Sequence, residues 1–453
     1  MLKPTKIWMV ALVMLTISCQ QPSKNNSDTG TINGHPAWMM QGNVYEVNVR
    51  QYTPEGTFRA FEAHLDRLHD MGVHTLWFMP IQPISKKDRK GTLGSYYAVA
   101  DYTGINPEYG NMEDWKHLVE AAHAKGFKVL MDWVPNHSGA DHYWLTKHPD
   151  FYVRDSAGNA ISQFDWTDTR KLNHSNPVLR DTMIEQMKFW IRESNIDGYR
   201  CDMAHLVPAE FWNPCIQALK NMKNIFMLAE ADAPWLHTAG FDATYGWPEF
   251  HLMNDIAAGK KKPTDMVAFL QQLDSTFPAN AIRLRFTSNH DENSWNKADY
   301  GTMPGSIHAP FAVLTHTLVR SLPLIYSGQE EPILRAIPFF EKDSMAFKQL
   351  ARAPLYKTLT TLRKNNAALR PDAAARILPT QLPDQVLAFI RSFEQHHILV
   401  LVNLSPNAVS FAVKDKQVTG MARNVFTATE ENLPANGQFS LDAWGYRVYE
   451  LNH

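Results

Sequence analysis

The stretch GYRCDMAH places Arg200 and Asp202 two residues apart, so in a strand both side chains point to the same side. Glu230 ends the apolar stretch IFMLAE, and His290 and Asp291 are neighbours in FTSNHDEN. Two carboxyl groups about 5 Å apart suit the retaining hydrolysis of a glycosidic bond, in which one attacks and the other donates a proton. A neighbouring cation such as Arg200 favours an ionised nucleophile, and a drier site favours a protonated acid. Taken alone, the Arg-x-Asp spacing also fits a structural ion pair.

An alternation of strands and helices is predicted to bring these residues together. Helical patterns such as TFRAFEAHLDRLHDMG and NMEDWKHLVEAAHAKG separate short apolar stretches, and both end in the glycine that a left-handed C-cap favours. Eight strands joined by helices predict an α/β fold, a closed TIM-type (β/α)8 barrel. An open doubly wound sheet is the competing fold, but no Gly-rich phosphate loop follows the first strand. The predicted strands are 43–49, 73–80, 128–134, 197–203, 225–230, 241–246, 282–289 and 323–328.

The ends of these strands carry most of the candidate site residues. In such a barrel the catalytic groups stand at the C-terminal strand ends. Asp132 lies near the end of the third strand, and Asn136 and His137 follow it. The residues between the charged groups are apolar, so these groups do not form a solvated charged face. The pattern predicts that several carboxylates meet at one mouth, whereas the pair Glu330 and Glu331 after the eighth strand is interpreted as structural.

Two segments depart from the alternation and define the predicted domains. An insertion after the third strand, residues 138–172, is aromatic and rich in Asp and His, as expected of a loop that shapes a site. After residue 370 the helical patterns stop and strand-like alternation predicts a C-terminal antiparallel β-sandwich, residues 370–453. The barrel is assigned to residues 37–137 and 173–369.

The first residues resemble a secretory leader with a lipid-attachment site. Lys3 and Lys6 precede a short apolar run that is too short to span a bilayer, and the stretch LTISC resembles a bacterial lipoprotein cleavage site. We therefore expect residues 1–19 to be a signal peptide with its lipidated Cys19, and residues 20–36 to be a polar tether. A lipid anchor would place the protein at the bacterial cell envelope, facing the periplasm or the outer surface. Ordinary cleavage with loss of Cys19 is the alternative.

Composition excludes some classes of partner. The formal net charge is −2 without a long run of one sign, which argues against nucleic acid or an acidic membrane surface as the main partner. The 13 Trp residues are interpreted as core more than as sugar-stacking platforms. Cys201 and Cys215 are predicted to be buried thiols. The sequence leaves the oligomeric state open.

Four ordered motifs carry a family resemblance. DWVPNH, GYRCDMAH, MLAEAD and FTSNHDEN resemble the four motifs of the α-amylase family, glycoside hydrolase family 13, and GSYYAVADYTGINPEYG resembles a further stretch of that family. The resemblance covers nearly the whole chain after the leader. It implies a catalytic barrel, the inserted domain B and the C-terminal domain C.

The resemblance also implies roles for individual residues. Asp202 resembles the nucleophile that forms a covalent glycosyl-enzyme, Glu230 the general acid and then base, and Asp291 the third carboxylate, which supports the transition state. His205 is a further substrate-binding candidate, although the Lys-His pair common after the nucleophile is replaced here by His and Leu. The other implied substrate-binding or supporting residues are Tyr97, which would stack on the sugar, Asp132, His137, Arg200 and His290.

The resemblance leaves the metal content open. Asn136 corresponds to a residue that often helps to bind a structural calcium in relatives, and Asp168 is a further candidate ligand. The insertion lacks an obvious run of Asp ligands. No cofactor is therefore assigned, and a structural Ca²⁺ stays open.

The sequence thus predicts a retaining hydrolase of α-linked glucans or maltooligosaccharides. Within the family, transglycosylases, isomaltose synthases and α-1,6-acting debranching enzymes are the alternatives. A non-catalytic glycan-binding module is a second class, which the intact carboxylate trio disfavours. A metal-dependent barrel hydrolase is a third, and no His-x-His follows the first strand.

Overall fold

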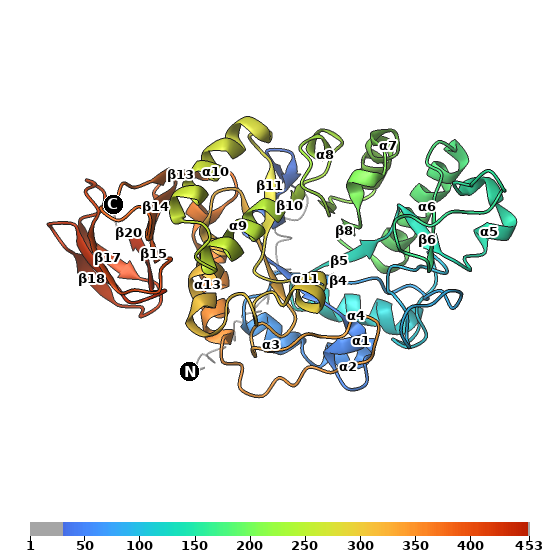
Figure 1. The fold of residues 1–453 in the computed structure, drawn as a ribbon, viewed down its shortest axis with the longest axis horizontal. Helices are drawn as coiled ribbons and strands as arrows, with labels where there is room; N and C mark the ends of the chain where they lie inside the picture. The colour runs from blue at the N-terminus through green and yellow to red at the C-terminus, as the bar shows by residue number, and fades with distance from the viewer. Residues whose placement is uncertain (1–29, 452–453) are drawn as a thin grey trace, which may run out of the picture.

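The computed structural model describes residues 30–451 as a central barrel with a smaller C-terminal sheet domain at one end of the long axis (Figure 1). The predicted leader with Cys19 and the first ten residues of the predicted tether lie outside the described residues. The rest of that tether is not a linker, because it forms the hairpin β1 (Thr31–Ile32) and β2 (His35–Pro36). His35 fixes this hairpin to the barrel, since its Nδ1 lies 3.0 Å from Asp242 Oδ1.

Eight parallel strands close into the predicted barrel, in the order β10-β11-β12-β3-β4-β5-β8-β9. Nearly all of their residues are buried, as expected for parallel strands that are covered on both faces. The prediction of a closed barrel over an open sheet is confirmed. The strands are β3 (Val44–Val47), β4 (Thr75–Phe78), β5 (Lys128–Trp133), β8 (Gly198–Cys201), β9 (Phe226–Ala229), β10 (Ala243–Tyr245), β11 (Ile282–Arg285) and β12 (Ser321–Tyr326).

Large apolar side chains fill the interior of the barrel. Trp77, Leu130 and Leu228 belong to one buried cluster, which also includes Trp38. Trp38 lies at the N-terminal end of the barrel, where the Lys128 ammonium that begins β5 is 5.5 Å from its ring centre. The apolar filling leaves the C-terminal end for polar side chains.

Helices cover the outside of the barrel. The second of the two quoted helical patterns forms one capped helix, but the first is split between α2 and α3 because the N–H of His64 donates to the carbonyl of Phe61, three residues back, and tightens the chain into a turn. Gly72 and Gly126 follow these patterns with φ of +80° and +88°, as predicted. The helices are α1 (Val49–Tyr52), α2 (Phe58–Glu62), α3 (Leu65–Asp70), α4 (Met112–Ala124), α5 (Trp144–Lys147), α6 (Pro177–Ser194), α7 (Ala209–Lys220), α8 (Trp235–Thr238), α9 (Trp247–Ala257), α10 (Pro263–Thr276), α11 (His290–Asn296), α12 (His308–Thr317) and α13 (Ala353–Asn365).

The insertion and the C-terminal domain lie at opposite ends of the molecule (Figure 1). The insertion is held by the two-stranded antiparallel sheet of β6 (His137–Gly139) and β7 (Thr169–Lys171). In the C-terminal domain a two-stranded sheet packs on a six-stranded antiparallel sheet through one apolar cluster, and Arg391 joins it to the barrel by donating to the carbonyls of Thr317 and Leu318. The predicted domain boundaries themselves stay predictions. The C-terminal strands are β13 (Ala374–Ile377), β14 (Val386–Phe393), β15 (His396–Asn403), β16 (Val409–Ala412), β17 (Gly420–Asn424), β18 (Glu430–Leu433), β19 (Gln438–Leu441) and β20 (Tyr446–Leu451).

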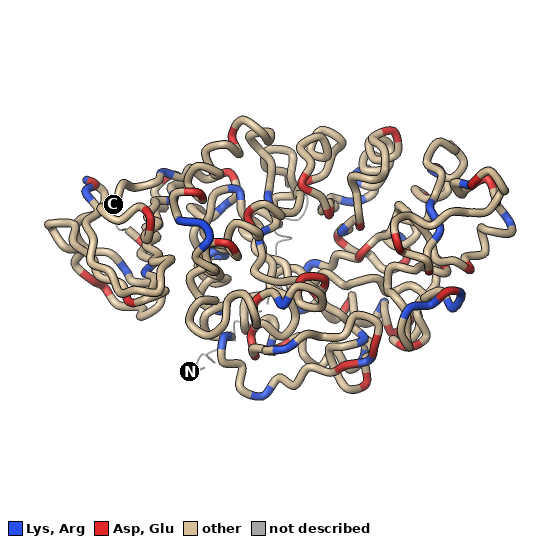
Figure 2. The backbone as a smooth tube through the Cα atoms, in the orientation of Figure 1, with Lys and Arg blue, Asp and Glu red and all other residues tan. Residues whose placement is uncertain are grey.

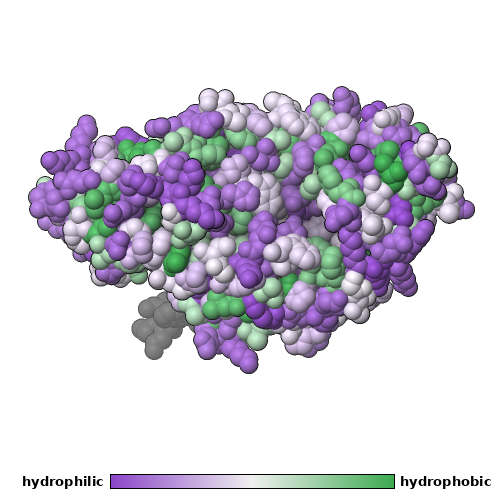
Figure 3. All heavy atoms as spheres, in the orientation of Figure 1, coloured by the Kyte–Doolittle hydropathy of each residue, from purple (hydrophilic) through white to green (hydrophobic). Residues whose placement is uncertain are grey.

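The distribution of surface charge and the state of the two cysteines agree with the predictions from the sequence. Basic and acidic residues are interspersed along the chain (Figure 2), and on the face in Figure 3 hydrophobic residues form small patches among hydrophilic ones. Cys201 and Cys215 are buried free thiols, as predicted. In residues 30–451, no helix has both the length and the apolar character needed to cross a bilayer.

Candidate active site

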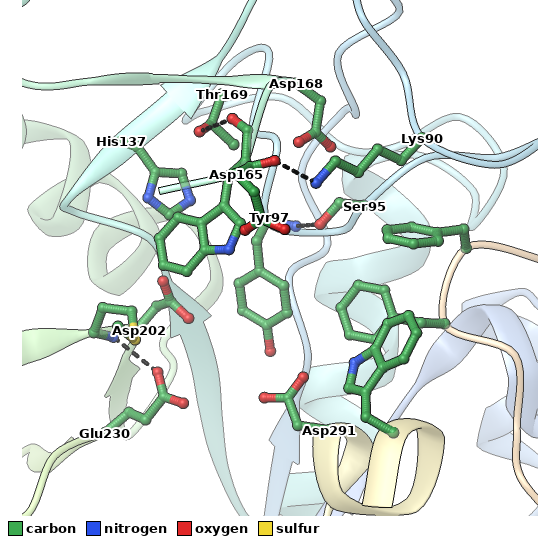
Figure 4. Close-up of a pocket in the computed structure, with 15 residues that line it drawn as sticks. Lys90, Ser95, Tyr97, His137, Asp165, Asp168, Thr169, Asp202, Glu230 and Asp291 are labelled. Carbon is green, nitrogen blue, oxygen red and sulfur yellow. Dashed lines mark hydrogen bonds between the residues drawn. The ribbon is translucent and has the colours of Figure 1, made fainter. Parts of the chain in front are cut away.

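A pocket of about 500 Å³ opens at the C-terminal ends of the barrel strands (Figure 4). Asp202, Glu230 and Asp291 all line it, together with residues of the insertion and of the loop after β12. Its volume lies in the range of pockets that enclose small ligands. The structure thus brings the three predicted carboxylates to one hollow.

Arg200 is the hub of this site. Its side chain is fully buried in β8, and Nη1 lies 2.9 Å from Asp132 Oδ1 and 3.1 Å from Asp202 Oδ1. Nη2 lies 3.1 Å from Glu230 Oε1, an ion-pair contact without hydrogen-bond geometry. One guanidinium therefore holds three carboxylates, because β8 lies between β5 and β9 and the strand register places Arg200 beside Asp132.

The two reacting carboxyl groups lie close together. Asp202 and Glu230 contact different nitrogens of the same guanidinium, each at 3.1 Å. This closeness fits the roughly 5–5.5 Å separation of a retaining pair better than the roughly 6.5–9.5 Å of an inverting pair. The backbone N–H of Met203, which has a left-handed φ of +44°, donates to Glu230 Oε2 at 2.8 Å.

Burial and charge separate the pKa values of this pair. Burial raises the pKa of Asp202 to about 6 and that of Glu230 to about 7, although the charge of Arg200 lowers both. The expectation that Arg200 keeps Asp202 ionised therefore holds only above about pH 6, because one arginine shared among three carboxylates does not offset their burial. Glu230 keeps its proton to higher pH than Asp202, as an acid beside a nucleophile must.

Asp291 has the opposite balance. It lies in the first turn of α11. Burial raises its pKa, but the charge of His290, the hydrogen bond from His290 and the charge of Arg200 together outweigh burial and keep the pKa below the ordinary value. His290 lies 3.2 Å from Asp291 Oδ2 through Nε2 and 2.5 Å from Glu46 Oε1 through Nδ1. Burial lowers the pKa of His290, but the two carboxylates raise it well above the ordinary value, so His290 is a cation beside the ionised Asp291.

Tyr97 lines the pocket, whereas Asp132 lies buried beneath it. The Tyr97 ring lines the pocket, lies nearly parallel to His290 at 5.5 Å, and its hydroxyl donates to Asp132 Oδ2 at 3.2 Å. Asp132 is completely buried beneath the pocket, where Trp77 Nε1 also donates to it at 3.2 Å. Asp132 therefore positions Arg200, whereas Tyr97 offers a ring to a bound group.

His137 lines the pocket as a neutral group. Burial lowers its pKa to about 4, and its ring packs against Trp166 at 5.2 Å. The Asn136 side-chain nitrogen donates to Gln163 Oε1 at 3.1 Å, and Asp168 lines the pocket. In the part of the chain that the structure describes, no group of three His, Cys, Asp or Glu side chains is arranged to hold a metal ion.

The structure does not bring His205 into this pocket. His205 is exposed in the turn Ala204–Leu206 and borders a separate hollow of about 340 Å³ together with Trp235. The left-handed Met203 turns the chain away from the pocket just before His205. Glu330, interpreted as structural, is buried against Arg67 at 2.8 Å and is not among the lining residues.

Sequence reasoning missed the buried Glu46 and most of the lining residues that come from loops, both polar ones such as Lys90 and Asp165 and several aromatic ones. Glu46 on β3 is the partner of His290, and its signal was available, since it is the single charge in the apolar strand NVYEVNV and lies near its C-terminal end. The aromatic lining residues have no local pattern, because they come from loops whose paths the sequence does not reveal. They are Trp166, Trp295, Phe339 and Phe340.

Two family profiles match the chain. "Alpha amylase, catalytic domain" matches residues 23–366, and "Maltogenic Amylase, C-terminal domain" matches residues 376–448. The first match covers the barrel and its pocket. The second covers most of the C-terminal sheet domain.

Curated relatives and solved structures are similar along most of the chain. "Alpha-amylase MalA" of Haloarcula japonica is 26% identical over 391 residues, 81% of this chain and 56% of the relative. "Cyclomaltodextrinase" of a Bacillus species is 26% identical over 430 residues, 81% of this chain and 73% of the relative. This chain thus spans just over half of the first relative's length and nearly three quarters of the second's.

Among solved structures, the noncanonic maltogenic alpha-amylase AmyB from Thermotoga neapolitana superposes with a TM-score of 0.84 at 26% identity, covering 92% of this chain and 100% of that one. An alpha-amylase from Lactobacillus plantarum gives a TM-score of 0.82 at 29% identity, covering 91% and 99%. Both similarities span the barrel and the C-terminal domain together.

Proposed function

Because the chain belongs to the α-amylase family, we propose that it is a retaining glycoside hydrolase that cleaves α-glucosidic bonds in starch-derived glucans or maltooligosaccharides. The family is retaining and acts through a covalent glycosyl-enzyme. The substrate class comes from the relatives, whose names include alpha-amylase, maltogenic alpha-amylase and cyclomaltodextrinase.

The proposal assigns one step to each of the two close carboxyl groups. An oxygen of ionised Asp202 attacks the anomeric carbon while Glu230 passes its proton to the departing glycosidic oxygen, which leaves as an alcohol. Glu230, now ionised, takes a proton from water, and the water oxygen displaces Asp202 from the same carbon. Each displacement inverts the configuration of the anomeric carbon, so the two together release the product as the α-anomer.

The remaining residues prepare the site for these steps. Arg200 compensates part of the charge on Asp202 and Glu230, and Asp132 holds Arg200 in place. Ionised Asp291 faces the same pocket, where its charge stabilises a sugar ring that turns positive in the transition state. Tyr97 offers an aromatic surface to that ring.

A single observation supports retention over inversion: Asp202 Oδ1 and Glu230 Oε1 each lie 3.1 Å from a different nitrogen of the one Arg200 guanidinium. Two carboxyl groups held by one guanidinium fit the roughly 5–5.5 Å separation of a retaining pair better than the roughly 6.5–9.5 Å that admits a water molecule in inversion. The test is proton NMR of maltoheptaose hydrolysis during the first minutes, before mutarotation. We expect the α-anomer first, and first formation of the β-anomer contradicts the proposal. Chromatography of products from maltoheptaose and pullulan then separates hydrolysis from transglycosylation and α-1,4 from α-1,6 cleavage.

We also propose that Cys19 carries a lipid that holds the protein at the bacterial cell envelope. The support is the stretch LTISC after a short apolar run. Labelling with a palmitate analogue and fractionation of the natural host test it. We expect label in the membrane fraction that disappears in Cys19→Ala, and an unlabelled wild-type protein contradicts the anchor.

A further inference from the structure

Two loop segments and one tryptophan of a helix meet on one side of the pocket and close it. Residues 86–94, between β4 and α4, lie between the insertion and residues 338–342 of the loop that joins β12 to α13. Trp295 at the end of α11 packs against the latter segment. We call residues 86–94 and 338–342 together with Trp295 the pocket wall.

On one flank the pocket wall is tied to the insertion. The Lys90 ammonium, which lines the pocket, donates to the carbonyl of Asp165 at 2.8 Å. Further ties join the beginning of the segment, residues 86–88, to the insertion, so the segment is held against the insertion along this flank. These ties are the backbone N–H groups of Lys86 and Lys87 on Asp141 Oδ2, at 2.8 and 3.0 Å, and Arg170 Nη2 on Asp88 Oδ2, at 2.8 Å.

On the other flank the same segment touches the loop after β12. The N–H of Leu93 donates to the carbonyl of Phe340 at 3.1 Å, and the N–H of Thr92 donates to Glu341 Oε1 at 2.8 Å. Gly91 approaches Phe340 so closely that an added Cβ would lie 2.4 Å from the Phe340 Cβ. The two segments are therefore in direct contact, and a polymer cannot pass between them.

The loop after β12 is itself fixed to the barrel. Gln51 Nε2 donates to the carbonyl of Glu341 at 3.0 Å, and Lys342 Nζ donates to the carbonyl of Thr53 at 2.8 Å. At α11, the N–H of Ile337 donates to the Asn293 side chain at 2.9 Å. These bonds hold the aromatic residues of the wall in place.

Aromatic rings fill the wall on the pocket side. Phe339 lies nearly parallel to Tyr97 at 6.3 Å and packs against Phe340 at 5.0 Å, and Trp295 covers Phe339 at 5.6 Å. Trp295, Phe339 and Phe340 all line the pocket. The wall therefore continues from the insertion to α11 without a break among the described residues.

The wall lies on the side of the pocket away from the general acid. Figure 4 shows Lys90 of the wall across the pocket from Glu230, with Tyr97 between them. If Glu230 protonates the leaving oxygen, the departing part of the substrate lies beside Glu230. The part that carries the non-reducing end then points toward the wall.

Building on the proposed function, we propose that the enzyme acts at chain ends: the non-reducing end of an α-glucan enters the pocket and stops at the wall, and a short saccharide is released. Internal bonds of a long chain are not reached, because the chain would have to continue through the wall. The substrate class is thus maltooligosaccharides and free non-reducing ends.

The test compares p-nitrophenyl α-maltoheptaoside with the same compound carrying a 4,6-O-ethylidene group on its non-reducing glucose. Chromatography of the first products gives the rate for each, without an auxiliary enzyme. We expect the blocked compound to react about a hundredfold more slowly, since the added group meets a closed wall. Equal rates overturn the inference. If neither compound is cleaved, the proposed function fails and the inference with it.

Variants show whether the wall is the cause. Phe340→Ala and Lys90→Ala should each raise the rate ratio of blocked to free compound about tenfold, because each opens one flank. Leu334→Ala is the matched control: Leu334 is 59% exposed on the same loop and does not line the pocket, so the ratio should stay unchanged. Circular dichroism checks that each variant is folded. An unchanged ratio in both folded wall variants overturns the inference.

Discussion

The barrel contains two buried clusters of arginines and carboxylates, and they differ in charge balance. At the mouth, Arg200 alone contacts Asp132, Asp202 and Glu230. In the second cluster, Arg283 and Arg285 of β11 share one buried carboxylate, Glu249 of α9, and Arg283 also contacts Asp232. The first cluster has more acids than bases, and the second does not.

This difference appears in the pKa values. Burial raises the pKa of Glu249, but the two arginines outweigh it, so the pKa lies below the ordinary value and the group is a stable anion. Burial raises the pKa of Asp202 to about 6 and of Glu230 to about 7 against a single arginine. A balanced cluster holds a fold together, whereas an acid-rich cluster leaves carboxyl groups that exchange protons near neutral pH.

The largest expected effect comes from removing the nucleophile of the acid-rich cluster. Asp202→Asn should lower kcat/KM on maltoheptaose roughly 10⁴-fold or more, because no group remains to form the covalent intermediate. Circular dichroism should show a folded protein. Normal turnover by this variant shows that Asp202 is not the nucleophile.

Removing the acid should have a smaller and substrate-dependent effect. Glu230→Gln should lower the rate on maltoheptaose about 10²- to 10⁴-fold, because the leaving oxygen departs without a proton. A glycoside with a dinitrophenolate leaving group, which needs no proton, should recover much of the first step. Equal losses on both substrates count against Glu230 as the acid.

The balanced cluster should respond in stability instead of catalysis. Glu249→Gln leaves two buried arginines without their shared anion, and we expect a loss of about 3–5 kcal/mol in the free energy of unfolding. Activity per folded molecule should change little, since Glu249 does not line the pocket. Urea denaturation and active-site titration measure the two quantities. An unchanged stability contradicts the interpretation of this cluster as structural.

The activity should follow a narrow bell-shaped pH profile. Catalysis needs Asp202 ionised, so kcat/KM falls as the pH drops below about 6, and it needs Glu230 protonated, so it falls as the pH rises above about 7. Asp291→Asn removes a negative charge that raises the pKa of Glu230, so the alkaline limb should move to lower pH. A limb that stays in place argues against this coupling.

The smallest effect is a pH-dependent gain in stability. The pKa of Asp202 is raised in the folded protein from 3.8 to about 6, so ionisation of this group destabilises the fold above about pH 6. Asp202→Asn should therefore raise Tm at pH 8, and the gain should shrink as the pH falls from 6 toward 4. The opposite holds for the lowered pKa of Glu249, whose stabilisation is lost on acidification. A Tm gain that does not depend on pH contradicts the assignment.

The sequence was sufficient where the information is local. All eight strands were predicted because each is a short apolar run, and Asp202, Glu230 and Asp291 were found because each ends such a run or directly follows one. Contacts between residues far apart in the sequence could not be predicted. Glu46 and His290, for example, are 244 residues apart.

Three other features depend on details that only the structure shows. His205 points away from the pocket because the backbone of Met203 is left-handed, and methionine as a residue type does not predict that conformation. The raised pKa of Asp202 depends on how many carboxylates share Arg200. The split of the first predicted helix depends on a turn at His64 that competes with a continuous helical pattern.

Trapping of the covalent intermediate tests the central claim most directly. The protein is incubated with a 5-fluoro-α-glucosyl fluoride, which slows release of the glycosyl group, and is then digested and analysed by mass spectrometry. We predict one added fluoroglucosyl group on the peptide that contains Asp202, and none in Asp202→Asn. A label on a different carboxylate, or turnover of the reagent without any labelled peptide, would contradict the account.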